Sequence, residues 1–294
     1  MRFPWLFRVA SVLLLVFVCW PAIAQAQYRW AIYTMRADGG DVKKITRLDE
    51  SFCGSPTWSR DGKRLAYDVT PASFDFSQTH IHAQALDAEK STDLGPGNTP
   101  CFSPDDGQLL FFVPNAKAGV KEGVWVMNAD GSGREWLSPG ARPRWSPDGE
   151  KFVYTSGDEG FPSAYIFDIV TLERTRIVER GYDDISGASW SPDGKQIVFA
   201  GRRGGKHELA IINAAAGQLP RASQLGEINP QPDWSPDGTK LLFSSTLNGQ
   251  GRIQLLEIAS QDVALVPGQF SRHNSDAVWS PDGKKIAFSS DRGP

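Results

Sequence analysis

The sequence predicts an all-β fold, a six-bladed β-propeller whose blades are four-stranded antiparallel sheets. Three observations lead to this prediction. A five-residue turn motif recurs six times at nearly constant spacing, a short apolar run follows each copy, and the two ends of the repeat region are complementary half-repeats. A four-stranded unit of about 44 residues that recurs in this way is typical of a propeller blade.

The turn motif reads Trp-Ser-Pro-Asp-Gly in its commonest form, and its serines are spaced 44, 43, 45, 44 and 45 residues apart. Proline presets the φ angle of a tight turn, aspartate bonds to the local backbone and glycine takes the corner with positive φ. Two copies depart from the pattern, since Arg60 replaces the proline and Asp106 stands where the other copies have glycine. The six serines are Ser59, Ser103, Ser146, Ser191, Ser235 and Ser280.

Each turn is followed by a short run of β-branched, aliphatic and aromatic residues, as in Leu65-Ala66-Tyr67. Runs of this composition between turn residues predict strands, so each motif marks a hairpin. A second strand pair follows in each repeat. Residues 124–131 show this pair best, and residues 32–39 repeat its register almost letter for letter.

The two ends of the repeat region predict how the ring closes. The region opens with the second half of a repeat and finishes with a first half, because 14 residues follow Ser280. We therefore expect strands within residues 275–290 to pair with strands within residues 28–47, which makes a sixth blade shared by both ends. Such pairing removes two free sheet edges. An open solenoid is the alternative, but it would need capping repeats.

Composition and charge exclude several classes of protein. The 29 Gly and 20 Pro residues favour many turns over long helices. An aromatic content of 11% and a formal net charge of −3 argue against a disordered chain. Lys and Arg number 31 against 34 Asp and Glu, so no basic excess is present to neutralise the phosphates of a nucleic acid.

Residues 1–26 are expected to form a secretory signal peptide. Arg2 and Arg8 precede or flank an uncharged apolar run at residues 9–20, and alanines follow at positions 22, 24 and 26. An uncleaved anchor is the alternative, but a spanning helix needs about 20 apolar residues. Residues 27–294 then form the propeller. Cleavage changes the formal charge from −3 to −5 and leaves a periplasmic or secreted protein without a membrane span.

Two cysteines, Cys53 and Cys101, remain after the expected cleavage. An oxidising compartment permits one disulfide bond between them. They occupy different positions within the repeat, however, so whether they are bridged stays open at this point.

The recurrent aromatic residue and the recurrent aspartate are both explained by structure. Five copies of the motif begin with Trp and the sixth begins with Phe102. An aromatic side chain at one repeated position predicts packing between neighbouring sheets, where it buries about 150–250 Å². A ligand cage is the alternative for the aromatic residues, and paired catalytic acids are the alternative for the aspartates. We expect the aspartates to be turn formers.

The repeat resembles the WD-like propeller repeat of the TolB family. The resemblance rests on Trp-Ser-Pro-Asp-Gly-Lys-x-Ile-x-Phe-Ser-Ser followed by Tyr-x-Met-Asn-x-Asp-Gly, and it extends from about residue 28 to the end. It implies a propeller that docks a periplasmic partner over its channel mouth. The same blades occur in peptidases similar to prolyl oligopeptidase and in some polysaccharide lyases. TolB also carries an N-terminal α/β domain, whereas here the propeller follows closely on the expected signal peptide, so the Tol–Pal role is not carried over whole.

Protein binding is the favoured function, as a monomer with one envelope protein or peptide as partner, and no catalytic residue is assigned. A peptidase commonly carries its nucleophile in Gly-x-Ser-x-Gly, and the sequence lacks this pentad. The alternative is a metal-dependent carbohydrate-active enzyme, a lyase or hydrolase. His80 and His82 are weak metal candidates because residues two apart on a strand share a face. Two exposed strand histidines without a metal are the favoured interpretation.

The loops at the channel mouth, opposite the Ser-Pro-Asp-Gly turns, are the expected binding site, because functional residues favour loops on a rigid scaffold. The longest loop, residues 70–79, carries Phe74 and Phe76, which either anchor a partner or fold back over the first blade. The loops between blades add polar groups that suit a peptide, and their acidic members suit a divalent cation, the one cofactor considered. These residues are Asp49, Glu50, Phe52, Asn98, Arg142, Asp183, Asp184, Asn229, Gln231, Arg272, His273, Asn274 and Asp276.

Overall fold

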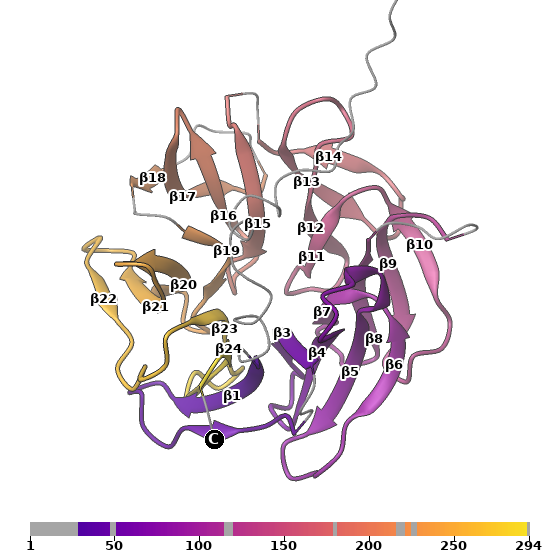
Figure 1. Cartoon of the computed structure of the whole chain (residues 1–294). Helices are drawn as coiled ribbons and strands as arrows, with labels where there is room; N and C mark the ends of the chain where they lie inside the picture. Colours follow the sequence, from indigo (N-terminus) through magenta and orange to yellow (C-terminus); the bar gives the residue numbers. More distant parts are fainter. Residues whose placement is uncertain are drawn as a thin grey trace, which may run out of the picture.

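The computed structural model describes residues 29–47, 51–114, 120–178, 181–215, 221–224 and 228–292. The expected signal peptide, residues 1–26, lies outside them. The described residues form 24 strands, one 3-10 helix, η1 (Phe76–Gln78), and no α-helix. The strands make six four-stranded antiparallel sheets around one axis, so the six-bladed propeller predicted from the sequence is confirmed (Figure 1). No helix within this part of the chain has the length and hydropathy needed to cross a membrane.

The first three blades follow one another along the chain. Blade 1 contains β3 (Ser51–Trp58), β4 (Arg64–Pro71), β5 (His80–Ala85) and β6 (Thr92–Pro96). Blade 2 contains β7 (Asn98–Phe102), β8 (Gln108–Val113), β9 (Gly123–Asn128) and β10 (Glu135–Ser138). Blade 3 contains β11 (Ala141–Trp145), β12 (Lys151–Ser156), β13 (Ser163–Asp168) and β14 (Arg174–Arg176).

The remaining blades complete the ring. Blade 4 contains β15 (Asp184–Trp190), β16 (Gln196–Arg203), β17 (Lys206–Asn213) and β18 (Arg221–Gln224). Blade 5 contains β19 (Ile228–Trp234), β20 (Lys240–Leu247), β21 (Gln250–Glu257) and β22 (Val263–Leu265). Blade 6 joins β23 (Asn274–Trp279) and β24 (Lys285–Ser290) to β1 (Ala31–Arg36) and β2 (Lys43–Lys44). The first strands β3, β7, β11, β15, β19 and β23 contact one another in turn and surround the central axis of the ring (Figure 1).

The shared blade closes the ring as expected. β1 pairs with β24 in antiparallel register, with Tyr33 opposite Phe288, and Figure 1 shows the indigo strand beside the yellow ones. The Tyr33 hydroxyl also donates to the carbonyl oxygen of Arg292 at 2.7 Å. On the other side, Trp30 forms a parallel bridge to Phe52 of blade 1. Hydrogen bonds between distant parts of the chain therefore hold the ring shut.

The repeated turns follow one hydrogen-bond scheme. In each turn the serine Oγ donates to the aspartate Oδ1 at 2.5–2.7 Å. The same Oγ accepts the backbone N–H five residues later at 2.9–3.0 Å. The serine hydrogen bond lowers the pKa of each turn aspartate, to about 2 for Asp237. The aspartates are turn formers, as predicted, and not paired acids.

The two departures from the turn motif compensate for each other. In the five turns that have glycine at the fifth motif position, this glycine lies close to the turn proline of the preceding blade, as Gly149 does against Pro104. Between blades 1 and 2 this contact is replaced by hydrogen bonds, because the N–H that Arg60 has and proline lacks donates to Oδ1 of Asp106 at 2.6 Å. Asp106 holds the corner with a φ of +60°. The Asp106 carboxylate thus accepts the backbone N–H of Arg60, whereas the usual proline and glycine at these two positions offer neither this donor nor this acceptor.

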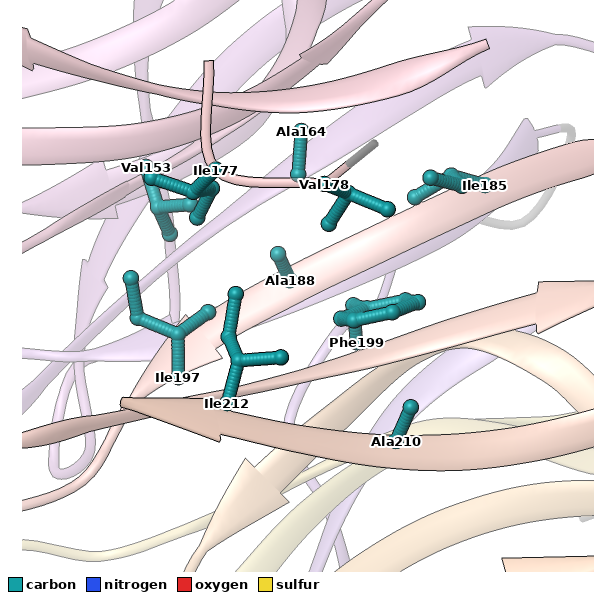
Figure 2. Packing of buried hydrophobic residues seen from close by; sticks show 10 residues of the cluster. All are labelled: Val153, Ala164, Ile177, Val178, Ile185, Ala188, Ile197, Phe199, Ala210 and Ile212. Carbon is teal, nitrogen blue, oxygen red and sulfur yellow. The ribbon is translucent and has the colours of Figure 1, made fainter. Parts of the chain in front are cut away.

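The hydrophobic core is divided into six clusters, one between each pair of neighbouring blades. Figure 2 shows the cluster between blades 3 and 4, in which Val153 and Ile177 face Ile197, Phe199 and other residues of blade 4. Since each blade buries apolar side chains on both faces, no blade has a complete core of its own. The closed ring therefore behaves as one domain.

The aromatic residue before each turn lies in these clusters, so its predicted role in packing is confirmed. Trp58, Phe102, Trp145 and Trp234 are 6–8% exposed. The indole N–H of Trp58 donates to the carbonyl of Val278 in blade 6, and Trp234 makes the equivalent bond to blade 4. These two bonds tie blade 1 to blade 6 and blade 5 to blade 4.

Cys53 and Cys101 are both buried and both free. Burial raises the pKa of the Cys53 thiol to about 11. A thiol with a raised pKa holds little thiolate near neutral pH and is unreactive. The question that the sequence left open is answered in favour of two unbridged cysteines.

Candidate functional site

The propeller has two different faces. Each first strand begins at the face that carries the loops between blades and ends at a Ser-Asp turn on the opposite face. We call these the mouth face and the turn face. The mouth face also carries the loops between the second and third strands, including η1 in blade 1. The loops predicted to bind a partner therefore surround one end of the channel.

A β-bulge interrupts the first strand of every blade; in five blades it includes the residue four before the turn serine, and in blade 4 it falls one residue earlier, at Ser186, next to Gly187. A bulge bends its strand and re-aims a side chain. Five of the six residues that stand four before a turn serine have a positive φ, from +48° to +93°. The sixth is Gly187, where an added Cβ would lie 2.8 Å from the backbone nitrogen of Gln231, so only glycine fits. This channel ring consists of Ser55, Thr99, Arg142, Gly187, Gln231 and Asp276.

Arg144 crosses the channel just below the ring. It belongs to β11 of blade 3, yet its Nη2 donates to the Oε1 of Gln231 in blade 5 at 2.9 Å. Its Nη1 donates to the carbonyl of Pro100 in blade 2 at 3.3 Å. One side chain thus joins three blades across the axis. The sequence analysis placed Gln231 at this site but missed Arg144.

Arg142 lies on the mouth side of Arg144 and is half-buried. Its Nη1 donates to the carbonyl of Ser186 in blade 4. Burial lowers the pKa of Arg142, and the negative charges of Asp276 and Asp184 act in the opposite direction. Asp276 belongs to blade 6, which stands opposite blade 3 in the ring. The predicted residues Arg142, Asp184, Gln231 and Asp276 therefore do come together at the channel.

Two carboxyl groups lie together where blades 6 and 1 meet. The Oδ2 of Asp276 accepts the hydroxyl of Ser289 at 3.0 Å. Asp68, on β4, is 8% exposed, and its Oδ2 accepts the backbone N–H of Thr99 at 3.0 Å. Burial, helped by the charge of Asp276, raises the pKa of Asp68 to about 6. Both carboxyl groups approach Gly54, where an added Cβ would meet Asp68 at 2.9 Å and Asp276 at 3.7 Å.

A third carboxyl group, that of Asp233 on β19, faces Arg144. Its Oδ2 accepts the backbone N–H of Trp279 at 2.8 Å, which links blade 5 to blade 6. Burial raises the pKa of Asp233 to about 6, against the opposing effect of the Arg144 charge. The sequence analysis missed both Asp68 and Asp233. Aligning the repeats would have found Asp68, since the other blades have Phe, Thr, Ala or Ser there.

Two pairs of aromatic rings lie on the mouth face where blades 6 and 1 meet. The rings of Phe52 and Phe74 are 4.0 Å apart between centroids, and Phe76 beside them is 50% exposed. Trp30 bridges to Phe52 through its backbone and stacks on His273 at 6.2 Å. We call these five residues the aromatic strip. Phe74 therefore folds back onto blade 1, whereas Phe76 presents its ring to solvent.

The other predicted loop residues take different places. Asn98 lies at the start of β7, and the Oδ2 of Asp183 accepts the N–H of Gly205 at 3.2 Å. Arg272 is exposed beside His273. Asn274 is a correction, because it is 0% exposed and its Oδ1 accepts the hydroxyls of Ser271 and Ser290 inside the seam. Asp49 and Glu50 lie outside the described residues, and the side chain of Asn229, in β19, is not described either.

His80 and His82 lie on β5, away from the first strands that line the channel. His80 contacts the carboxylate of Asp93 at 2.9 Å through Nδ1, and His82 contacts the hydroxyl of Ser91 at 2.9 Å. His82 also stacks on Tyr67, and burial lowers the pKa of its imidazole. Within the described ranges no three His, Cys, Asp or Glu side chains gather as metal ligands. Metal binding stays a prediction.

Comparisons with known proteins point to one family. The model of the TolB beta propeller domain matches residues 135–293. An uncharacterized protein of Agrobacterium fabrum is 28% identical over 193 residues, covering 58% of this chain and 61% of its own. The Tol-Pal system protein TolB of Alcanivorax borkumensis is 42% identical over 65 residues, covering 21% and 14%, and that of Roseobacter denitrificans is 29% identical over 164 residues, covering 53% and 33%. The chain thus spans less than two thirds of each of these curated relatives.

Solved structures share the fold. A protein assigned as TolB from Agrobacterium tumefaciens superposes with a TM-score of 0.75 at 20% identity, covering 90% of this chain and 98% of the other. TolB of Acinetobacter baumannii gives 0.66 at 20% identity, covering 90% and 64%. An oligogalacturonate lyase in complex with manganese gives 0.55 at 20% identity, covering 73% and 68%. At these identities the likeness is one of fold.

Proposed function

Because the chain belongs to the TolB β-propeller family, we propose that it is exported to the cell envelope and acts there as a protein-interaction module whose partner docks at the channel mouth. The Tol-Pal relatives support an envelope role in general. The partner itself is identified neither by the family nor by the fold.

The aromatic strip is the observation that carries this proposal. Phe76 is 50% exposed and Phe74 is 38% exposed, and both stand on a loop of a rigid blade. Aromatic anchors of this kind dominate the energy of protein interfaces, since they bury a large area at a small cost in conformational entropy. Phe76 stands two residues from Phe74 in the same loop, the ring of Phe74 contacts Phe52, and Phe52 is bridged through its backbone to Trp30, so a partner would meet residues from both blade 1 and the start of blade 6.

The ring of channel residues extends this surface inward. Ser55, Thr99 and Asp276 are each half-buried, so part of each side chain stays accessible to a segment that enters the channel. The crossing by Arg144 limits how deep such a segment can reach. The result is a docking site that has an aromatic rim and a polar centre. Such a site suits a peptide or a loop of another protein.

Crosslinking of the tagged protein in envelope extracts tests the proposal. The variant carrying Phe74→Ala and Phe76→Ala should recover roughly tenfold less crosslinked partner than the wild type. The reason is that truncation of an interface hot spot commonly costs more than about 2 kcal/mol of binding free energy. The matched control carries Val170→Ala and Leu172→Ala, two residues that are 78% and 66% exposed. They lie in the turn after β13, which faces away from the channel mouth.

Equal recovery by the aromatic double variant and the wild type, with unchanged melting temperatures, would refute docking through the strip. Fractionation of the same cells checks export. A protein that stays in the cytoplasm would contradict the envelope location.

A further inference from the structure

Among the residues that the structure describes, two guanidinium groups on one side of the channel contact neutral oxygens and no carboxylate. Arg142 donates to the carbonyl of Ser186, and Arg144 donates to the carbonyl of Pro100 and the amide of Gln231. Every ion pair found within the described residues involves other side chains. The basic side of the channel therefore lacks a carboxylate in direct contact.

A guanidinium group that is partly removed from water is stabilised by an anion in contact with it, and without one it loses hydration without full compensation. Arg142 shows this imbalance, because burial lowers its pKa in spite of the attraction of Asp184 and Asp276. The residue as a whole is half-buried, and Nη1 is its one guanidinium nitrogen with a hydrogen bond found among the described residues.

The acidic groups across the channel are held by other donors. Asp276 accepts the hydroxyls of Ser275 and Ser289, and Asp233 accepts the backbone N–H of Trp279. These bonds keep both carboxylates against blades 5 and 6, beyond ion-pair distance of Arg142. Asp184 of blade 4 also acts on Arg142 through its charge, but it makes no ion pair with Arg142, so among the described residues no carboxylate contacts this guanidinium group.

We propose that Arg142, with Arg144 beneath it, is a binding site for a carboxylate group that a partner segment inserts from the channel mouth. A planar guanidinium group binds a carboxylate through two parallel hydrogen bonds, which makes arginine the residue best suited to this ligand. The carboxylate belongs either to an acidic side chain or to a chain terminus, because both have the same chemistry. This proposal rests on the proposed function and names the chemistry that the channel recognises in the partner.

Three capped glycine peptides distinguish the sources of the carboxylate. One carries a central glutamate and an amidated end, the second has only a free C-terminal carboxylate, and the third carries glutamine and an amidated end. Isothermal titration at low salt should show one carboxylate peptide binding at least roughly tenfold more tightly than the glutamine peptide, the difference expected for a charge-assisted pair. Equal binding of all three peptides overturns the proposal.

Variants of the purified protein locate the site. Arg142→Gln should remove the preference for carboxylate, whereas Arg60→Gln, the same charge change on the turn face, should keep it. Asp276→Asn should strengthen carboxylate binding, since it removes a negative charge opposite Arg142, and this variant serves as the test if Arg142→Gln does not fold. A preference that survives Arg142→Gln, or an affinity that Asp276→Asn lowers, overturns the proposal. The two proposals can fail separately. If partner recovery depends on the aromatic strip but no peptide shows a preference for carboxylate, this inference is refuted and the proposed function stands.

Discussion

Asp68 should make the protein more stable in mild acid than at neutral pH. Asp68 is 8% exposed, and burial raises the pKa of its carboxyl group in the folded protein to about 6 from the ordinary value of 3.8. The folded state therefore binds this proton more tightly than the unfolded state does. For an acid with a raised folded pKa, the free energy of unfolding rises as the pH falls from above 6 towards 4.

The size of the effect follows from the two pKa values. Between pH 7.5 and pH 5 a single group with these values adds about 1.4 kcal/mol to the free energy of unfolding. Asp233 has the same raised value, so the two groups together add about 3 kcal/mol. The turn aspartates contribute little change in this interval, because their lowered pKa values keep them ionised throughout.

Urea unfolding at pH 5.0, 6.0 and 7.5 measures the effect in the wild type and in Asp68→Asn. Asparagine can still accept the N–H of Thr99 but carries no charge, so the variant should gain stability at pH 7.5 and lose part of the pH dependence. His82 has a lowered pKa and acts in the opposite direction, since its contribution is lost as the pH falls. Comparing the two proteins at each pH cancels the His82 effect. An identical pH dependence in both proteins would refute the reasoning.

Three further predictions concern the repeated elements. Trp234→Ala should lower the free energy of unfolding by roughly 3–5 kcal/mol, because it opens a cavity between blades 4 and 5, and an unchanged melting temperature would contradict the packing. Ser235→Ala should lower the free energy of unfolding in urea by about 1–2 kcal/mol, because the hydroxyl both donates to Asp237 and accepts the N–H of Lys240. An unchanged free energy of unfolding would show that the turn does not need these two hydrogen bonds. Arg60→Pro and Asp106→Gly should each lower the free energy of unfolding, because each removes the bond between the two turns. In a double-mutant cycle, the double variant should be about 1 kcal/mol more stable than the sum of the two single losses predicts. Strict additivity would show that the two residues do not interact.

The period of the repeat accounts for most of what the sequence could predict about the fold. Turns, hairpins, the aromatic packing position and the shared blade all follow from a pattern that six copies confirm against one another. The channel was harder to predict, because a bulge in each first strand decides which residues face the axis. Arg142 lies in the bulge of its strand, where regular alternation does not apply, and of the two arginines only Arg142 was named from the sequence.

Contacts across the closing seam were also beyond reach of the sequence pattern. Trp30 and His273 stack, and Phe52 meets Trp30, because β1 lies beside β24. The repeat predicts the shared blade but not which rings meet above it. Asn274 was predicted to contact a partner, but its side chain is fully buried and accepts a hydrogen bond from Ser271. The repeat pattern does not show this burial.

The shared blade has a consequence for how the protein folds. The bond from Tyr33 to Arg292 joins residues 259 positions apart, so blade 6 cannot form until nearly the whole repeat region is present. Contacts of such long range are slow to form, because the chain loses much entropy before they are made. Until then β1 can pair only with its sequence neighbour β2, and its other edge stays exposed to capture by other chains. A protein of this design is therefore most vulnerable to aggregation in the interval just before its ring closes, and chaperones that cover a single strand would protect it best.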